Sequence, residues 1–261
     1  MIIKLFITIV TALLLFDTSL FADKLEDIKK SGIMKVGLKV NAKPFSYKSR
    51  SGRLIGFEVD LIKKMAKILK VKVKFVEVTS KNRFQYVIED KVDISLATAT
   101  HTVKRDVNVD FSISYFYDGQ AIVARADLVA GSYKDFNGKT IAAVEGSTSG
   151  AVFEVIQPLC KVIYFKTMGD AIQAIYDKKA DAATSDFGLL FAHYKASKGK
   201  LKMVGKKFTL EPYGMSMKEN ESNFRDEINF ALQTVVKNGD YVKLHKKWFL
   251  VGPSRKPTLW P

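Results

Sequence analysis

The chain has very little cysteine and histidine. Its 261 residues include one cysteine, Cys160, and three histidines, His101, His193 and His245. A single cysteine cannot form an intramolecular disulfide, and so few thiol and imidazole groups cannot assemble a clustered metal site. We therefore expect neither a disulfide-stabilised scaffold nor a structural zinc protein, and the sequence indicates no metal and no cofactor.

Long hydrophobic runs, internal repeats and low-complexity segments are also lacking. The longest mostly apolar run, residues 5–16, has about 12 residues, short of the roughly 20 that cross a bilayer. It follows Lys4 and precedes Ala22 and a polar stretch, which is the layout of a secretory signal peptide. We expect residues 1–22 to be this signal, with cleavage after Ala22 and the mature protein in the periplasm.

The composition, 47% hydrophobic and 26% charged, is typical of a globular protein of one large or two medium domains. The net charge of +15 raises the question of a nucleic-acid or membrane partner. However, lysines are scattered along the whole chain. The densest stretch, Lys195 to Lys207, is interrupted by glycines and apolar residues and has no aromatic interleaving. This stretch is interpreted as a solvated face, and no nucleic acid is expected as a partner.

Hydrophobic periodicity predicts an α/β protein, because strand and helix patterns alternate along the chain. Apolar residues at helical spacing predict a helix over 57–69, and alternation at 71, 73 and 75 predicts a half-exposed strand. Further strands are expected at 34–38, 92–97, 121–123, 141–144, 162–165 and 180–184. Further helices are expected at 82–89, 148–156, 168–176, 186–196, 222–237 and 240–249.

Four local strings carry polar and aromatic residues at the ends of these elements. The first is Lys-Val-Asn-Ala-Lys-Pro-Phe at 39–45, followed by Gly-Phe-Glu-Val-Asp at 56–60, and the second is Thr-Ser-Lys-Asn-Arg-Phe at 79–84. The third is Thr-Ala-Thr-His-Thr-Val-Lys-Arg at 98–105, which leads to Asp-Phe-Ser at 110–112. The fourth pairs Glu-Gly-Ser-Thr-Ser at 145–149 with Thr-Ser-Asp at 184–186.

In this order and spacing, the strings resemble the periplasmic amino-acid-binding proteins of ABC importers over nearly all of residues 25–249. The resemblance implies a type II periplasmic binding protein fold: two α/β lobes, two crossover hinge strands, and a ligand cleft between the lobes. The implied lobe 1 comprises residues 23–118 plus 214–261, and lobe 2 comprises residues 119–213. The implied partners are an amino acid and an inner-membrane ABC permease, and we expect a monomer.

The resemblance also implies which residues hold the α-groups of the ligand. Arg105 matches the arginine that grips the α-carboxylate, and a guanidinium suits a carboxylate bidentately. Asp186 matches the aspartate that pairs with the α-ammonium, although by itself it also fits a helix N-cap. Thr98 and Thr100 match positions that complete these contacts. Thr102 is expected to cap the short helix that begins there.

Three further residues complete the expected site. Ser147 and Thr148 follow Gly146 at a helix start, where free N–H groups face an anion, although an ordinary N-cap fits equally well. Phe45 matches the aromatic region of the first lobe and is expected to line the cleft, whereas Phe57 is expected in the core.

Specificity is predicted from Lys39 and Arg83, which resemble the aspartate/glutamate-binding members, where both positions meet the side-chain carboxylate of the ligand. With Arg105 and Asp186 they give a site of about +2, which suits an anionic ligand and repels a cationic one. Two departures are noted: Val103 replaces a common proline, and Met168 stands where some acidic-ligand binders have a histidine.

Three other functions stay open. One is a binding protein for a neutral polar amino acid such as glutamine. Another is an enzyme like the cyclohexadienyl dehydratases, which share this fold but need a general acid that the motifs do not supply; we therefore expect no catalytic residue. The third is a soluble ligand-loaded partner of a sensor.

Overall fold

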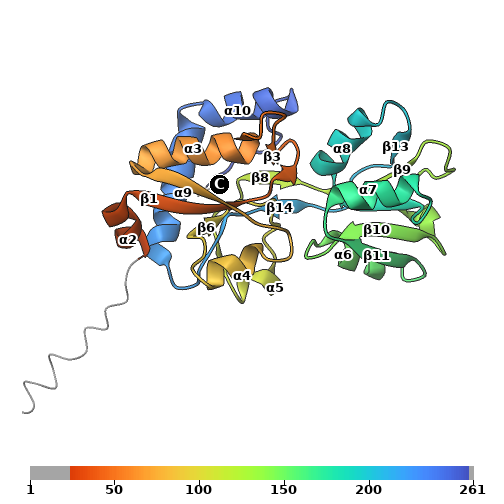
Figure 1. Cartoon of the computed structure of the whole chain (residues 1–261), viewed down its shortest axis with the longest axis horizontal. Helices are drawn as coiled ribbons and strands as arrows, with labels where there is room; N and C mark the ends of the chain where they lie inside the picture. The colour runs from red at the N-terminus through yellow and green to blue at the C-terminus, as the bar shows by residue number, and fades with distance from the viewer. Residues whose placement is uncertain (1–23, 259–261) are drawn as a thin grey trace, which may run out of the picture.

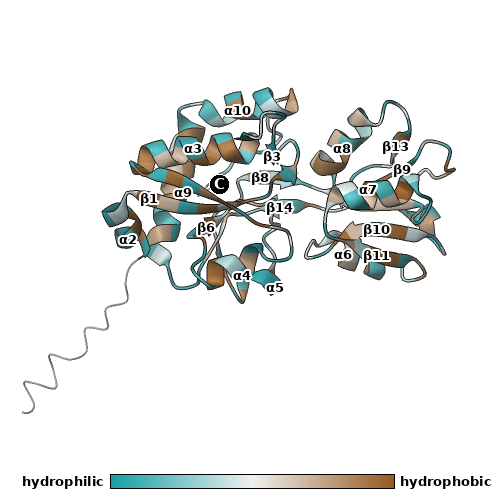
Figure 2. Ribbon diagram, in the orientation of Figure 1, coloured by the Kyte–Doolittle hydropathy of each residue, from teal (hydrophilic) through white to brown (hydrophobic). Residues whose placement is uncertain are grey.

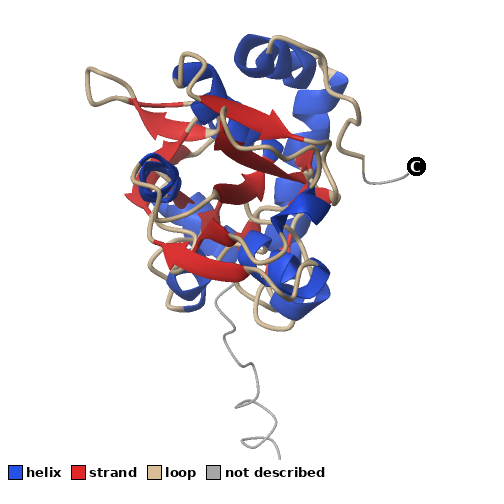
Figure 3. Cartoon of the chain, turned by 90° about the vertical axis from the view of Figure 1, so that its right-hand side faces the viewer, coloured by secondary structure: helices blue, strands red, loops and turns tan. Residues whose placement is uncertain are grey.

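The computed structural model describes residues 24–258, so the expected signal peptide lies outside the described residues. Figure 1 shows two lobes side by side along the long axis. Each lobe is built on a five-stranded sheet flanked by helices, and Figure 3 shows this layering along that axis. In residues 24–258 no helix is both long and apolar enough to cross a membrane.

The sheet of the first lobe is parallel at one edge and antiparallel at the other, with β1 pairing parallel to both β5 and β6. Its strands, in spatial order, are β5 (Lys72–Glu77), β1 (Ile33–Leu38), β6 (Ile94–Ser95), β15 (Ser216–Met217) and β7 (Asp110–Phe111). A small sheet beside it contains β2 (Asn41–Ala42), β3 (Ser46–Lys48) and β4 (Leu54–Ile55). The helices of this lobe are α2 (Lys24–Ser31), α3 (Phe57–Leu69), α4 (Arg83–Ile88), α5 (Val103–Asp106), α9 (Ser222–Lys237) and α10 (Asp240–Phe249).

In the sheet of the second lobe, β11, β10 and β12 pair in parallel. At the other edge, β9 pairs antiparallel with both of its neighbours, β12 and β13. Its strands, in spatial order, are β11 (Lys161–Phe165), β10 (Thr140–Val144), β12 (Ala182–Asp186), β9 (Gln120–Arg125) and β13 (Leu201–Val204). The flanking helices are η1 (Tyr133–Phe136), α6 (Ser149–Ile156), α7 (Met168–Tyr176) and α8 (Phe187–Ala196).

The core of the second lobe lies on both faces of its sheet because neighbouring side chains of a strand point in opposite directions. On β9, Ala121 and Val123 pack with α7 and α8, while Ile122 and Ala124 pack with Phe136 and Phe153 on the other face. Every residue of β9 except the last is therefore buried.

The helices follow the predicted hydrophobic spacing. The helix expected at 57–69 is confirmed with the same bounds, and those expected at 168–176, 222–237 and 240–249 are confirmed as well. Figure 2 shows hydrophobic and hydrophilic residues alternating along α3, as an amphipathic helix requires. In contrast, β13 lies unpredicted within the lysine-rich stretch, where Leu201 and Val204 are buried between exposed lysines.

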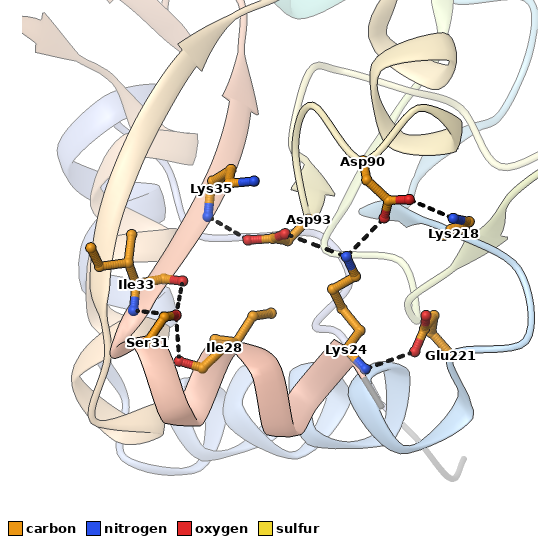
Figure 4. Close-up of polar contacts among 9 residues, drawn as sticks. All are labelled: Lys24, Ile28, Ser31, Ile33, Lys35, Asp90, Asp93, Lys218 and Glu221. Carbon is orange, nitrogen blue, oxygen red and sulfur yellow. Dashed lines mark hydrogen bonds and ion pairs between the residues drawn. The ribbon is translucent and has the colours of Figure 1, made fainter. Parts of the chain in front are cut away.

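The start of the described chain is held to the first lobe by ion pairs (Figure 4). The Nζ of Lys24 lies 2.8 Å from Asp90 Oδ1, and its backbone N–H donates to Glu221 at 3.1 Å. Lys218 binds the other oxygen of Asp90 at 2.5 Å. These contacts join α2, the turn after α4 and the segment before α9.

The two lobes are connected where β8 (Phe116–Asp118) pairs antiparallel with β14 (Glu211–Tyr213). Glu211 lies opposite Asp118 in this pair, and both carboxylates are buried. Acidic side chains therefore sit in the connection itself, next to the junction of the lobes.

The orientation of α3 generates a stability prediction. Leu61 is fully buried against the first sheet, whereas Ile68, on the same helix, is 38% exposed. Leu61→Ala is expected to lower the free energy of unfolding by about 2–5 kcal/mol, because the cavity left behind cannot fully collapse. Ile68→Ala is the matched control, with an expected loss of about 1 kcal/mol or less. Urea unfolding followed by circular dichroism measures both, and equal losses would contradict this orientation.

Candidate functional site

A cavity between the lobes collects the polar residues at the strand ends. Its empty volume is about 740 Å³, including the mouth that opens to solvent, which falls within the range of small-molecule sites. Eight of the nine predicted site residues line it: Lys39, Arg83, Thr98, Thr100, Arg105, Ser147, Thr148 and Asp186. They converge because Lys39 follows β1 and Asp186 ends β12, so the carboxyl ends of strands from both sheets meet at the cavity.

Phe45 is placed elsewhere. Its ring is fully buried in the first lobe, 4.9 Å from the ring of Phe116 and 5.3 Å from that of Phe249, and it does not line the cavity. The resemblance-based expectation that it lines the cleft is therefore not met, because an aromatic cluster at the base of the hinge surrounds this ring. Phe57 belongs to the same core, as expected.

Arg83 is positioned by the turn before α4. Thr79 and Asn82 bond to each other's backbone N–H, at 2.7 Å and 3.2 Å, which fixes the turn that introduces Arg83. The buried guanidinium donates to the carbonyls of Ala97 and Thr98 at 2.5 Å and 3.0 Å. Its Nε is buried without a partner among the described residues. The sequence pattern did not indicate this engagement with main-chain carbonyls.

Thr98 occupies a strained backbone conformation at the end of the β6 segment. Its φ is +47°, which is unusual for a β-branched residue. The conformation is held by Glu58, a fully buried carboxylate on α3 that accepts the Thr98 N–H at 2.8 Å and the Tyr115 hydroxyl at 2.5 Å. The sequence motifs did not identify Glu58 as a residue that supports the site. Its position on the apolar face of a predicted helix is the signal that could have identified it.

Arg105 lies on α5, which Thr102 caps by accepting the Arg105 N–H, as predicted. The guanidinium donates to the Thr100 carbonyl at 2.8 Å and to the Gly146 carbonyl at 3.0 Å. These bonds occupy two of its five N–H groups. The other three have no hydrogen bond within residues 24–258 and are available to an anion in the cavity.

At Gly146 the second lobe makes a close contact with the first. Its carbonyl accepts hydrogen bonds from Arg105 and also from Arg83, the latter at 3.2 Å. Its φ is +74°, and a Cβ at this position would lie 2.5 Å from the Ser80 carbonyl oxygen. Next to it, Glu145 pairs with Lys81 at 3.0 Å. Only glycine allows the two lobes to approach this closely here.

Asp186 stands at the N-cap position of α8, but its side chain does not cap the helix. Instead its Oδ2 accepts the Tyr213 hydroxyl at 2.5 Å, and its Oδ1 is buried with no partner among the described residues. Burial and the nearby Asp118 raise the pKa of Asp186 to about 7. This arrangement disfavours the ordinary N-cap interpretation, and it leaves one buried acceptor oxygen unpartnered on a residue that lines the cavity.

Lys39 is the cationic counterpart of Asp186. It is 7% exposed, and its Nζ makes no hydrogen bond to any part of the chain that the structure describes. Burial, together with repulsion from Arg83, lowers its pKa to about 8. Lys39 and Asp186 thus each bring to the cavity lining a buried charged group with an atom that has no hydrogen-bond partner among the described residues.

Ser147, Thr148 and Met168 complete the side of the second lobe. Ser147 donates its hydroxyl to the Val144 carbonyl at 2.7 Å, and Thr148 is the residue before α6 but makes no capping hydrogen bond with its side chain. Met168 lines the cavity from the start of α7 while packing into the core of the second lobe.

The comparison with known families decides the identity of the fold. Residues 34–251 match the model of the bacterial extracellular solute-binding proteins, family 3. The chain belongs to this family. As a family 3 protein it has the two-lobed α/β fold that the sequence motifs implied, with two hinge strands at the junction.

Relatives of this family 3 protein differ in their named ligands. The chain is 32% identical to the ABC transporter glutamine-binding protein GlnH of Bacillus subtilis, over 89% of this chain and 86% of the relative. It is 26% identical to the L-glutamate/L-aspartate-binding protein of Pseudomonas aeruginosa, over 86% of this chain and 79% of the relative. A solved structure of an ancestral amino acid-binding protein, a precursor of cyclohexadienyl dehydratase, superposes with a TM-score of 0.81 at 32% identity, covering 86% and 99% of the two chains.

The raised pKa of Asp186 predicts how the stability of the ligand-free protein depends on pH. Between pH 3.8, its ordinary pKa, and about 7, the folded chain binds a proton that the unfolded chain does not. The contribution of this group to the free energy of unfolding therefore rises as pH falls through 7. Asp186→Asn removes the cost of burying the charge, so the variant is expected to be more stable than the wild type at pH 8, with a smaller difference at pH 5.

Urea unfolding of ligand-free protein at both pH values measures this difference. Asp226→Asn, which changes an exposed carboxylate on α9, is the control and is expected to show no such pH-dependent difference. A difference for Asp186→Asn that is the same at pH 5 and pH 8 would contradict the assignment.

Proposed function

We propose that this chain is the amino-acid-binding component of an ABC importer and that it captures L-aspartate or L-glutamate in the cavity between its lobes. The observation that carries the acidic preference is Lys39, a buried ammonium that has no hydrogen-bond partner in the described chain. A buried ammonium without a hydrogen-bond acceptor is costly even with Glu58 and Asp186 nearby, and a ligand carboxylate would relieve that cost.

The α-groups of the ligand are assigned to opposite sides of the cavity. The free N–H groups of Arg105 would receive the α-carboxylate, and the unpartnered Oδ1 of Asp186 would receive the α-ammonium. Arg105 comes from the first lobe and Asp186 from the second. A bound ligand would therefore contact both lobes, which is the condition for a ligand to favour a closed arrangement.

The side-chain carboxylate is assigned to Lys39, with Arg83 beside it. Arg83 contributes its buried, unpartnered Nε and its charge, since its Nη1 already serves two carbonyls. Burial and the nearby Arg105 lower the pKa of Arg83 to about 9, so it stays cationic at neutral pH. Five cations line the cavity, Lys39, Arg83, Arg105 and the more exposed Lys43 and Lys166, against the two carboxylates Glu77 and Asp186, and this excess favours an anionic ligand.

Glutamine is the second candidate, and two observations favour it. The relative GlnH, named as glutamine-binding, is 32% identical to this chain, more than the glutamate/aspartate-binding relative from Pseudomonas. In addition, the bonds of Arg83 to carbonyls leave it less free to grip a carboxylate than the sequence motif implies. Lys39 could accommodate a carboxamide oxygen with a single hydrogen bond.

We favour binding over catalysis. Asp186 and Glu77 are the carboxylates on the cavity lining in the described residues; the first is assigned to the ligand ammonium, and the second pairs with Lys48 at 3.3 Å. The expected setting is the periplasm, and the expected macromolecular partner is an inner-membrane permease.

Lys39→Met is expected to separate acidic from neutral ligands. Loss of a buried, charge-assisted hydrogen bond costs about 1.5–3 kcal/mol, so affinity for L-glutamate and L-aspartate should fall by about 10- to 150-fold. The affinity for L-glutamine should fall by less than the affinity for L-glutamate, because its uncharged side chain loses one hydrogen bond to Lys39 but no ion pair.

Calorimetric titration of refolded, ligand-free protein with the three amino acids tests this prediction. Lys35→Met, which changes an exposed lysine on β1, the strand that Lys39 follows, is the matched control and should leave all three affinities unchanged. Equal losses for glutamate and glutamine would sink the acidic assignment and leave the neutral one.

Arg105→Ala is expected to weaken every α-amino acid that the wild type binds. Truncating one partner of a buried charge pair costs about 2–5 kcal/mol, which corresponds to a loss of about 30- to 5,000-fold. Arg53→Ala, at an exposed position away from the cavity, is the control. Retention of affinity within about 3-fold of wild type in the Arg105 variant would refute the carboxylate assignment.

A further inference from the structure

Glu211 accepts hydrogen bonds from three threonine hydroxyls at the junction of the lobes. It lies on β14, is 4% exposed, and does not itself line the cavity. Its Oε2 accepts the hydroxyls of Thr100 at 2.6 Å and Thr148 at 3.1 Å, and its Oε1 accepts that of Thr209 at 2.8 Å. The sequence motifs did not single out this residue.

One carboxylate oxygen therefore joins the two halves of the site. Thr100 follows β6 of the first lobe, and Thr148 precedes α6 of the second, yet both hydroxyls point to the same Oε2. Both threonines line the cavity on their other side. Glu211 belongs to the strand that connects the lobes, so it can hold both hydroxyls at once.

The hydrogen-bond chemistry of these groups restricts what they offer to a ligand. A threonine hydroxyl has one hydrogen and two lone pairs, while a carboxylate only accepts. The hydrogens of both threonines are thus directed at Glu211, and lone pairs remain for the cavity. Thr148 also accepts a hydrogen bond from Gln120 Nε2 at 3.0 Å, which leaves it one lone pair.

We propose that Glu211 is a positioning residue: it fixes the hydroxyls of Thr100 and Thr148 as hydrogen-bond acceptors and so makes the cavity select α-amino acids over deaminated acids of the same skeleton. An ammonium group is a pure donor and satisfies such acceptors, whereas a methylene group in its place leaves them unsatisfied. Asp186 also lines the cavity, and its buried Oδ1 is a further acceptor without a partner among the described residues. The inference rests on the proposed function only in requiring an α-amino acid ligand, whatever its side chain.

Glu211→Gln is the direct test. With its –NH2 group on the side of Thr100 and Thr148, a carboxamide donates to both hydroxyls, and their hydrogens turn toward the cavity. The measured quantity is the ratio of the dissociation constants for glutarate and L-glutamate, determined by calorimetry. We expect this ratio to fall at least tenfold in the variant, through weaker glutamate binding, while glutarate binding changes less than threefold.

Glu211→Asp and Glu219→Gln are the controls. The aspartate keeps an acceptor-only carboxylate and should retain most of the wild-type ratio. Glu219 is an exposed residue outside the cavity, and its substitution should change neither constant. If Glu211→Gln weakens both ligands equally, so that the ratio is unchanged, Glu211 only holds the hinge together and the proposal is overturned.

Thr100→Val and Thr148→Val keep the test decisive should Glu211→Gln fail to fold. Each removes one of the two positioned acceptors and should lower the same ratio, and a ratio within threefold of wild type in both variants overturns the proposal. If the wild type binds L-glutamine instead of L-glutamate, the ligand pair becomes L-glutamine and glutaramic acid; only the acidic specificity then fails, and this inference is judged on the new ratio. A wild type that binds no α-amino acid overturns both.

Discussion

Buried charge without internal compensation is the constraint on which the cleft depends. Lys39 and Asp186 both line the cavity, and neither the ammonium of the first nor Oδ1 of the second has a hydrogen-bond partner in residues 24–258. Transferring such groups from water into a protein is costly unless they are paired. The opposite shifts in their pKa values, to about 8 for Lys39 and about 7 for Asp186, express that cost. The scaffold around them must be stable enough to bear it.

The charged residues around the cleft come from different parts of the molecule. The cations Lys39, Arg83 and Arg105 all come from the first lobe, whereas Asp186 comes from the second and Glu211 from the connecting strand. Such an arrangement suits a zwitterion, whose carboxylate is attracted to the cations and whose ammonium is attracted to the acidic residues. The connection between the lobes therefore contributes charge to the surroundings of the cleft as well as joining the lobes, and the aromatic cluster around Phe45 packs against it through Phe116 of β8.

Sequence patterns predicted the parts of this molecule that depend on local or periodic information. The bounds of α3 followed from apolar spacing, and the site residues at strand ends followed from motif order. The partners of Arg83 could not be foreseen, because they are main-chain carbonyls more than ten positions away. Glu58 and Glu211 share this limitation, since their role depends on which distant donors the fold brings to them. Phe45 lies in the aromatic region of the first lobe, as its motif implied. The packing of distant rings around it, which the motif does not contain, decides that it lies in the core and not on the cavity.

The carbonyl of Gly146 has a consequence for how quickly solutes enter and leave. Because one oxygen of the second lobe accepts from both Arg83 and Arg105, any separation of the lobes at this point breaks both bonds together. The step that lets solvent in is then also the step in which both guanidinium groups lose their hydrogen bonds to this carbonyl. Entry and escape of a solute at this point are therefore both tied to the rupture of the same two bonds.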